Sequence, residues 1–170
     1  MAVDLTLKGV QITNREATPR VLNNPGLGEG GRAKVAYGHL ASVTASLSIT
    51  SIIRLIALPS NAVVTDLRIT SAAQGAGAFD VGVYRTNGDG GAVVDQDFFA
   101  TAVSCASAVV NVDVLNESTT NTIAKQGQPL WQAAGMASDP KSTLDIALTV
   151  AGTDVTTGTG AIALRAVYVD

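Results

Sequence analysis

The chain has 170 residues, of which 46% are hydrophobic, 15% charged and 4% aromatic, and its formal net charge is −3. This length and hydrophobic content suit one domain with a sizeable core, although the charged fraction is well below that of an average soluble domain. The negative charge, with basic residues scattered along the chain, argues against nucleic-acid binding. No apolar run is long enough to span a membrane, and the first residues lack the pattern of a secretory signal.

Residues 1–33 differ in composition from the rest of the chain. A short strand is expected over residues 5–12, and Pro and Gly then recur between Pro19 and Gly31. Because this density of Pro and Gly prevents long regular elements, we expect an extended N-terminal arm (1–33) in front of a single β domain (34–170). The arm has little core of its own to bury, so we expect it to be either mobile in the free protein or laid on a partner. Its candidate contact residues are Arg15, Arg20, Val21, Leu22 and Leu27.

From residue 34 onward, apolar and polar residues alternate with a period of two, as in half-buried strands. This pattern covers 63–70, 79–84, 110–114 and 143–150. Two further segments, 52–58 and 161–169, are apolar on both faces, and for 52–58 this predicts a central strand. Glycine-rich turns separate the runs. Asp80 and Asp145 lie on the polar faces of their strands, where we expect them to face solvent or an interface.

Two segments have helical spacing. Residues 92–103 fit either a helix or a strand, whereas 129–137 predicts a short helix with Pro129 near its start. Seven or eight strands with at most two short helices predict an all-β fold. The expected architecture is an antiparallel β-sandwich, jelly-roll-like, with an extended N-terminal arm.

Residues that could carry catalysis are sparse. His39 is the only histidine and Cys105 the only cysteine, so neither a Ser-His-Asp arrangement nor the usual zinc sites are favoured. We expect a structural or surface histidine, a buried cysteine and no enzymatic activity.

Other motifs also favour structural interpretations. Gly26, Gly28 and Gly31 match a G-x-G-x-x-G spacing, but a strand-like segment follows them instead of the helix that nucleotide binding needs. The oxygen donors Asn87, Asp89, Asp95 and Asp97 do not match a calcium loop, and a solvated hairpin turn is the expectation. Trp131 is expected to anchor the core against Leu130 and Met136, with an interface anchor as the alternative. No cofactor is predicted.

Five segments, taken in order, resemble small structural proteins of tailed bacteriophages. They are 14–23, 54–64, 79–84 with 91–100, 129–132 and 163–169. The resemblance implies a virion component, in particular a head decoration or cement protein that is synthesised in the bacterial host cytoplasm and placed on the capsid surface. It further implies a homotrimer, with the major capsid protein as partner. The arm residues named above are expected as capsid contacts from their own chemistry, because Val21, Leu22 and Leu27 can be buried while Arg15 and Arg20 donate hydrogen bonds.

Other functions stay open at this point. A different virion position, in the tail or the head–tail junction, fits the same resemblance. A carbohydrate-binding β-sandwich is a further alternative, although the low aromatic content gives it little support. An enzyme is the alternative that the sequence supports least.

Overall fold

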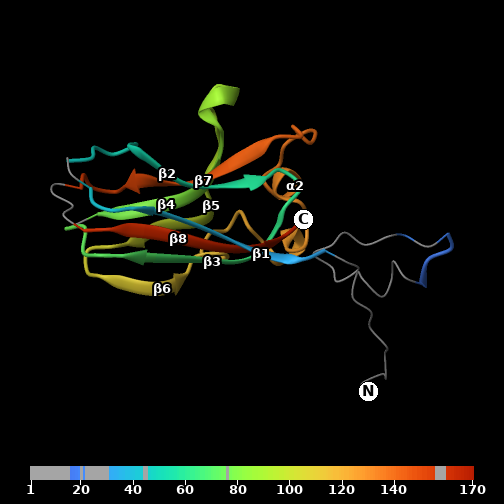
Figure 1. The fold of residues 1–170 in the computed structure, drawn as a ribbon, viewed down its shortest axis with the longest axis horizontal. Coiled ribbons are helices and arrows are strands. Elements are labelled where there is room, and N and C mark those ends of the chain that lie inside the picture. The colour runs from blue at the N-terminus through green and yellow to red at the C-terminus, as the bar shows by residue number, and fades with distance from the viewer. Residues whose placement is uncertain (1–15, 20, 22–30, 44–45, 76, 156–159) are drawn as a thin grey trace, which may run out of the picture.

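The computed structural model describes residues 16–19, 21, 31–43, 46–75, 77–155 and 160–170. About half of this part of the chain lies in eight strands: β1 (Ala33–Leu40), β2 (Ile52–Pro59), β3 (Val63–Ser71), β4 (Ala78–Arg85), β5 (Val93–Ser104), β6 (Val109–Asp113), β7 (Thr143–Ala151) and β8 (Ile162–Val169). They form two antiparallel four-stranded sheets, with strand orders β1-β8-β3-β6 and β2-β7-β4-β5. The sheets lie face to face (Figure 1), which confirms the predicted all-β sandwich.

The order of pairing gives the fold its topology. β1 pairs with β8, β2 with β7, β3 with β6 and β4 with β5. The chain is therefore one long hairpin rolled into two sheets, which is the arrangement of a jelly roll.

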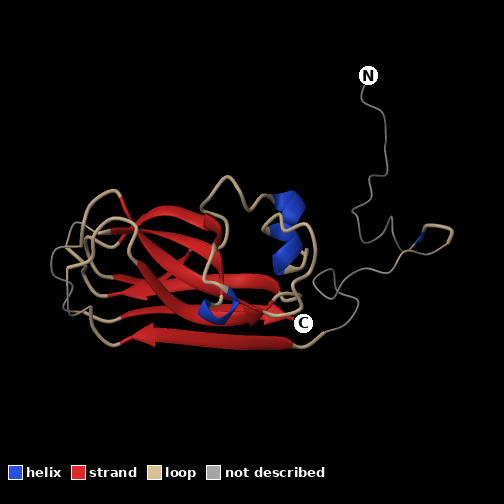
Figure 2. Cartoon of the chain, turned by 90° about the horizontal axis from the view of Figure 1, so that it is seen from above, coloured by secondary structure: helices blue, strands red, loops and turns tan. Residues whose placement is uncertain are grey.

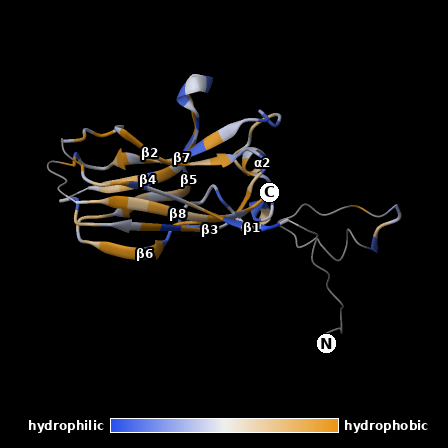
Figure 3. Cartoon of the chain, viewed as in Figure 1, coloured by the Kyte–Doolittle hydropathy of each residue, from blue (hydrophilic) through white to orange (hydrophobic). Residues whose placement is uncertain are grey.

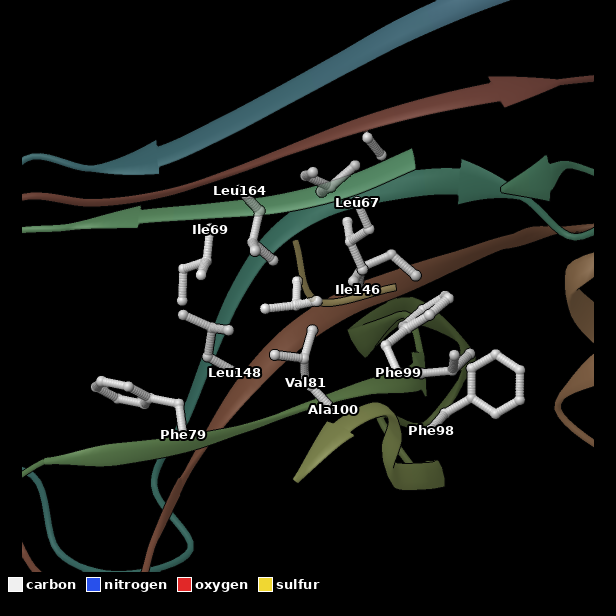
Figure 4. Packing of buried hydrophobic residues seen from close by; sticks show 14 of the residues in the cluster. Leu67, Ile69, Phe79, Val81, Phe98, Phe99, Ala100, Ile146, Leu148 and Leu164 are labelled. Atoms are coloured by element: carbon white, nitrogen blue, oxygen red, sulfur yellow. The ribbon is translucent and has the colours of Figure 1, made fainter. Parts of the chain in front are cut away.

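The core lies between the two sheets and is built by strict alternation. In β7, for example, Leu144, Ile146 and Leu148 are fully buried and point inward. They meet residues of the opposite sheet and of the neighbouring strands, among them Leu67, Ile69, Phe79, Val81, Phe98, Phe99 and Leu164 (Figure 4). Burying such side chains contributes about 1.5–3 kcal/mol each relative to exposure, so this interior is the main source of stability in a chain without a disulfide.

The expectation that 52–58 forms a central strand is wrong. β2 lies at the edge of its sheet, and its register shifts between Arg54 and Ile56, so that Leu55 is half-buried at a bulge. The edge is closed by β1 of the other sheet: a Cβ atom on Gly38 would lie 1.8 Å from the Leu55 carbonyl oxygen. Leu55 therefore packs against β1 at the sheet edge, whereas Ile52 of the same strand stays 42% exposed.

β6 also departs from simple alternation. Val110 and Val112 are exposed, because the register between β3 and β6 shifts and Asn111 has a left-handed φ of 56°. Figure 3 shows this strand as a hydrophobic ribbon at the margin of its sheet. A short, bulged edge strand of this kind discourages pairing with another chain.

Helices are confined to connecting segments (Figure 2). The described residues contain the α-helix α2 (Leu130–Ala133) and the 3-10 helices η2 (Asn87–Asp89) and η3 (Ile123–Lys125). The short helix expected within 129–137 is thus confirmed, and the ambiguous segment 92–103 forms strand β5. Trp131 is half-buried against the core.

The boundary of the N-terminal arm stays a prediction. Of the arm residues, the structure describes only 16–19, 21 and 31–33, and the strand expected over 5–12 lies outside the described residues. β1 begins at Ala33, which pairs with Val169 near the end of the chain.

Candidate interaction surface

The outer face of the β1-β8-β3-β6 sheet carries exposed apolar and aromatic side chains. Strand register places Val35 of β1 opposite Val167, and Tyr37 opposite Arg165. Directly opposed residues of antiparallel strands share one face of the sheet, so these side chains all point away from the core. Val35 is 67% exposed and Tyr37 is 65% exposed on β1, the edge strand of this sheet.

One row of four residues crosses the whole sheet. Tyr37 lies opposite Arg165, Arg165 opposite Arg68, and Arg68 opposite Asp113. Two arginines directly opposite each other repel, and two carboxylates offset their charge. Asp66 accepts from Arg68 Nε at 2.8 Å and from Arg165 Nη2 at 3.3 Å, and Asp113 lies 3.9 Å from Arg68 Nη2. The result is a half-exposed ionic network with no net charge.

A shallow depression lies beside this row. Asn111 contributes a carbonyl to Arg68 Nη1 at 3.3 Å and its side-chain oxygen to Arg165 Nη2 at 3.5 Å. Its backbone N–H in turn donates to the Thr70 hydroxyl at 3.0 Å. The depression is lined by Tyr37, Arg68, Thr70, Asn111, Ala163, Leu164 and Arg165. It presents both hydrogen-bond donors and a phenol ring to an incoming partner.

The outer face of the other sheet is filled by the protein's own chain. Tyr84, Ala147 and Thr149 lie on this face and yet are no more than 1% exposed. Part of the cover is β5, in which four residues between Asp95 and Ala100 oppose Gly82 alone. A Cβ atom on Gly82 would lie 2.1 Å from the Gln96 carbonyl oxygen, so the backbone of β5 rests directly on the sheet.

Polar side chains complete that cover. Asp80 is 7% exposed, which corrects the expectation of a solvent-facing carboxylate: it accepts 2.8 Å hydrogen bonds from Gln96 Nε2 and from the Ala102 N–H. The Tyr84 and Thr149 hydroxyls are hydrogen-bonded to each other. Burial raises the pKa of the Tyr84 phenol, and the bond to Thr149 partly opposes this shift.

Arg54 fixes the hairpin between β4 and β5 to the same sheet. Its Nη1 donates to the Arg85 carbonyl at 2.6 Å and to Asp145 at 2.8 Å, and its Nη2 donates to the Gly91 carbonyl at 2.9 Å. Asp145, expected to face solvent or an interface, is thus committed to an internal ion pair. The hairpin with η2 projects away from the sandwich (Figure 1).

Of the predicted contact residues, the structure describes one. Val21 is 48% exposed, as a contact residue requires before binding. Arg15, Arg20, Leu22 and Leu27 lie outside the described residues, so their contact role stays a prediction.

Residues considered for chemistry are not brought together into a reactive site. His39 is exposed on β1 and stacks on Tyr37 with a centroid distance of 5.7 Å. Cys105 is buried, and burial raises the pKa of its thiol. Asp89 is paired with Arg85 at 2.6 Å, and within the described ranges no three His, Cys, Asp or Glu side chains are grouped to hold a metal ion.

The exposed row on β1 was missed by sequence reasoning. Alternation in 33–40 places Val35, Tyr37 and His39 on one face and Ala36 and Gly38 on the other. A larger apolar face is normally the buried one, so the pattern alone favours the wrong side. A usable signal is Gly38, since a glycine within a strand often marks a close approach of another backbone.

No protein-family model matches this sequence, and no curated protein matches it significantly. Among the described residues, no helix is long and apolar enough to cross a membrane.

Two solved structures share the fold. A chain of the cyanophage Pam1 capsid asymmetric unit is 16% identical with a TM-score of 0.51, and the match covers 91% of this chain and 96% of that one. A chain of the Ralstonia phage GP4 capsid is 18% identical with a TM-score of 0.58, and the match covers 84% of this chain and 87% of that one. At these identities the likeness establishes a shared fold across most of the chain.

Proposed function

We propose that this protein is a structural component of a tailed-phage virion, and specifically a cement protein that decorates the head and stabilises its lattice. The observation that carries the proposal is the fold likeness to chains of two phage capsids, which extends over 91% and 84% of this chain. A jelly roll alone would not be sufficient, because the same fold serves viral capsid proteins and lectins.

The surface chemistry supports this assignment. Only 15% of the residues are charged, and the exposed sheet face combines valines and a tyrosine with a neutral ionic network. Such a surface suits protein–protein contact, whose buried core is poor in charge and rich in aromatic residues and arginine.

The test is the copy number of the protein in purified virions, measured by native or quantitative mass spectrometry. A cement protein is expected at a copy number in step with that of the major capsid protein, because each lattice position is occupied. A copy number of about a dozen or fewer would instead support a head–tail or tail position, whose ring symmetries are small.

The resemblance stated above further predicts a homotrimer. Size exclusion coupled to light scattering should give the trimer mass for the free protein. The oligomeric state on the capsid is measured by cross-linking on intact particles. A protein that is monomeric both in solution and on the capsid would contradict self-association.

Carbohydrate binding is the second candidate. Exposed Tyr37 lies beside Asn111 and Arg165, so an aromatic ring is next to hydrogen-bonding groups. Carbohydrate-binding sites combine these two features, because the ring stacks on the sugar and the polar groups bind its hydroxyls. Glycan-array binding by the purified protein, lost in Tyr37→Ser, would favour it over the cement role.

A further inference from the structure

The two outer faces of the sandwich differ in what covers them. On the β2-β7-β4-β5 sheet, Tyr84 and Thr149 are buried, the backbone of β5 lies against Gly82, and the Arg54 guanidinium lies 5.5 Å from the centre of the Tyr84 ring. On the β1-β8-β3-β6 sheet, Val35 and Tyr37 are about two-thirds exposed. One face is therefore completed by the fold itself, whereas the other lacks such a cover within the described residues.

We propose that the outer face of the β1-β8-β3-β6 sheet, centred on Tyr37 and Arg165, is the surface that rests on the capsid shell. This inference depends on the proposed cement function and adds the orientation of the protein on the head. The projecting β4–β5 hairpin, which belongs to the opposite sheet, then points away from the shell.

The residue types on this face are those that dominate binding energy. Interface hot spots are enriched in Tyr and Arg that sit centrally and become desolvated on binding. Tyr37 and Arg165 are cross-strand neighbours, and Val35 and Val167 form an apolar row beside them. Since Tyr37 is already stacked on His39, it loses little conformational freedom when a partner covers it.

The contacts of Arg165 indicate the chemistry of the partner. Its side chain is 47% exposed, and among the described residues its hydrogen bonds run through Nη2 alone, to Asp66 and Asn111. The remaining guanidinium donors are available to carboxylates or backbone carbonyls. A protein surface that offers such acceptors next to apolar groups is complementary to this face.

The start of β1 agrees with this orientation. Residues 1–32 join the sandwich at β1, whose outward row of Val35, Tyr37 and His39 borders the proposed surface. A shell that binds the arm through Val21 and its neighbours could therefore contact the adjacent sheet face as well. The two contacts together raise the effective affinity for the shell.

The experiment is co-sedimentation of the full chain with shells assembled from the major capsid protein alone. Tyr37→Ser and Arg165→Gln should each weaken binding at least about tenfold, as expected for hot spots. Ile123→Ser and Arg85→Gln are matched controls: Ile123 is 85% exposed on η3 and Arg85 lies at the base of the projecting hairpin, so neither should change binding. Melting temperatures check that all variants fold, and Val35→Ser replaces any variant that does not.

The outcomes separate the two proposals. If the unaltered protein binds shells and the sheet-face variants bind equally well, the inference fails while the cement function stands. If the unaltered protein does not bind shells, the proposed function fails, and the inference fails with it. If Tyr37→Ser changes the oligomeric state in light scattering without changing shell binding, the face is a contact between copies and the inference is overturned.

Discussion

Gly38 lies where β1 and β2 of the two sheets come closest. A Cβ atom there would be 1.8 Å from the Leu55 carbonyl oxygen, a contact that only backbone movement can relieve. Gly38→Ala should therefore destabilise the fold by about 1–3 kcal/mol or more, the cost of forcing extra atoms into a packed region. Urea denaturation measures this difference in the free energy of unfolding.

Gly88→Ala is the control for that substitution. The Cβ atom would meet only the Thr86 hydroxyl, at 3.9 Å, so its effect should stay within about 0.5 kcal/mol. Equal stability of the Gly38 and Gly88 variants would contradict the close approach of the two sheets.

Asp95 supplies a pH-dependent prediction. Burial, a hydrogen bond with Asp97 and the charge of Asp97 raise the pKa of the Asp95 carboxyl. The folded state therefore binds this proton more tightly than the unfolded state, so stability falls as the pH rises from the unfolded pKa through the folded pKa. Asp95→Asn should raise the melting temperature near neutral pH and have little effect at about pH 3, where the carboxyl is protonated in both states.

Glu117→Gln, which removes an exposed carboxylate, serves as the comparison for Asp95→Asn. Because this side chain is exposed, the substitution should change the free energy of unfolding by no more than about 0.5 kcal/mol. A stabilisation by Asp95→Asn that persisted undiminished at acid pH would show that the gain has a cause other than the removed charge.

At the scale of elements, Arg54 joins β2, β7 and the β4–β5 hairpin through its three hydrogen bonds. Arg54→Met keeps much of the aliphatic packing but leaves Asp145 unpaired, and Asp145 is only 14% exposed. We expect a loss of about 2–4 kcal/mol in the free energy of unfolding. Hydrogen exchange should accelerate in residues 85–93 while β8 keeps its protection.

The double variant Arg54→Met with Asp145→Asn tests the cause. Removing the unpaired charge should restore part of the lost stability, because the desolvation cost of the carboxylate disappears. The opposite result would be additivity: Asp145→Asn would lower the free energy of unfolding by the same amount with Met at position 54 as with Arg54 present. In that case the ion pair would not be the dominant interaction.

At the scale of the whole molecule, the arm and the sandwich are expected to have separate roles. Deleting residues 1–30 leaves β1 intact, including the pair of Ala33 with Val169 and the ion pair of Lys34 with Asp170 at 2.7 Å. We expect the truncated protein to keep its melting temperature within a few degrees and to bind capsid shells much more weakly. Ordering an arm costs about 1 kcal/mol or more per residue, so its contacts on a partner must offset that cost.

Two results would count against this division. Unchanged shell binding by the truncated protein would mean that the arm does not contribute contacts. Loss of folding would mean that the arm belongs to the sandwich and that the boundary at residue 33 is misplaced.

The sequence by itself determined the fold class and most strand positions. Alternation in 63–70, 79–84 and 143–150 is visible because one face of each strand must be buried, and Gly-rich turns separate the strands. The helix near Pro129 was also predictable from a local signal, because proline favours the first turn of a helix.

Only the tertiary structure decided which faces are covered. The sequence pattern of 52–58 does not distinguish a central strand from an edge strand whose bulge at Leu55 packs against β1, because which neighbours a strand has is not encoded in its local period. Alternation also could not show that Asp80 is buried, because that depends on its hydrogen bonds to Gln96 and Ala102 of β5. Nor could it show that Val35 and Tyr37 point outward, because that depends on which face of β1 meets the opposite sheet. Such choices arise from contacts between residues far apart in the chain, which a local period does not encode.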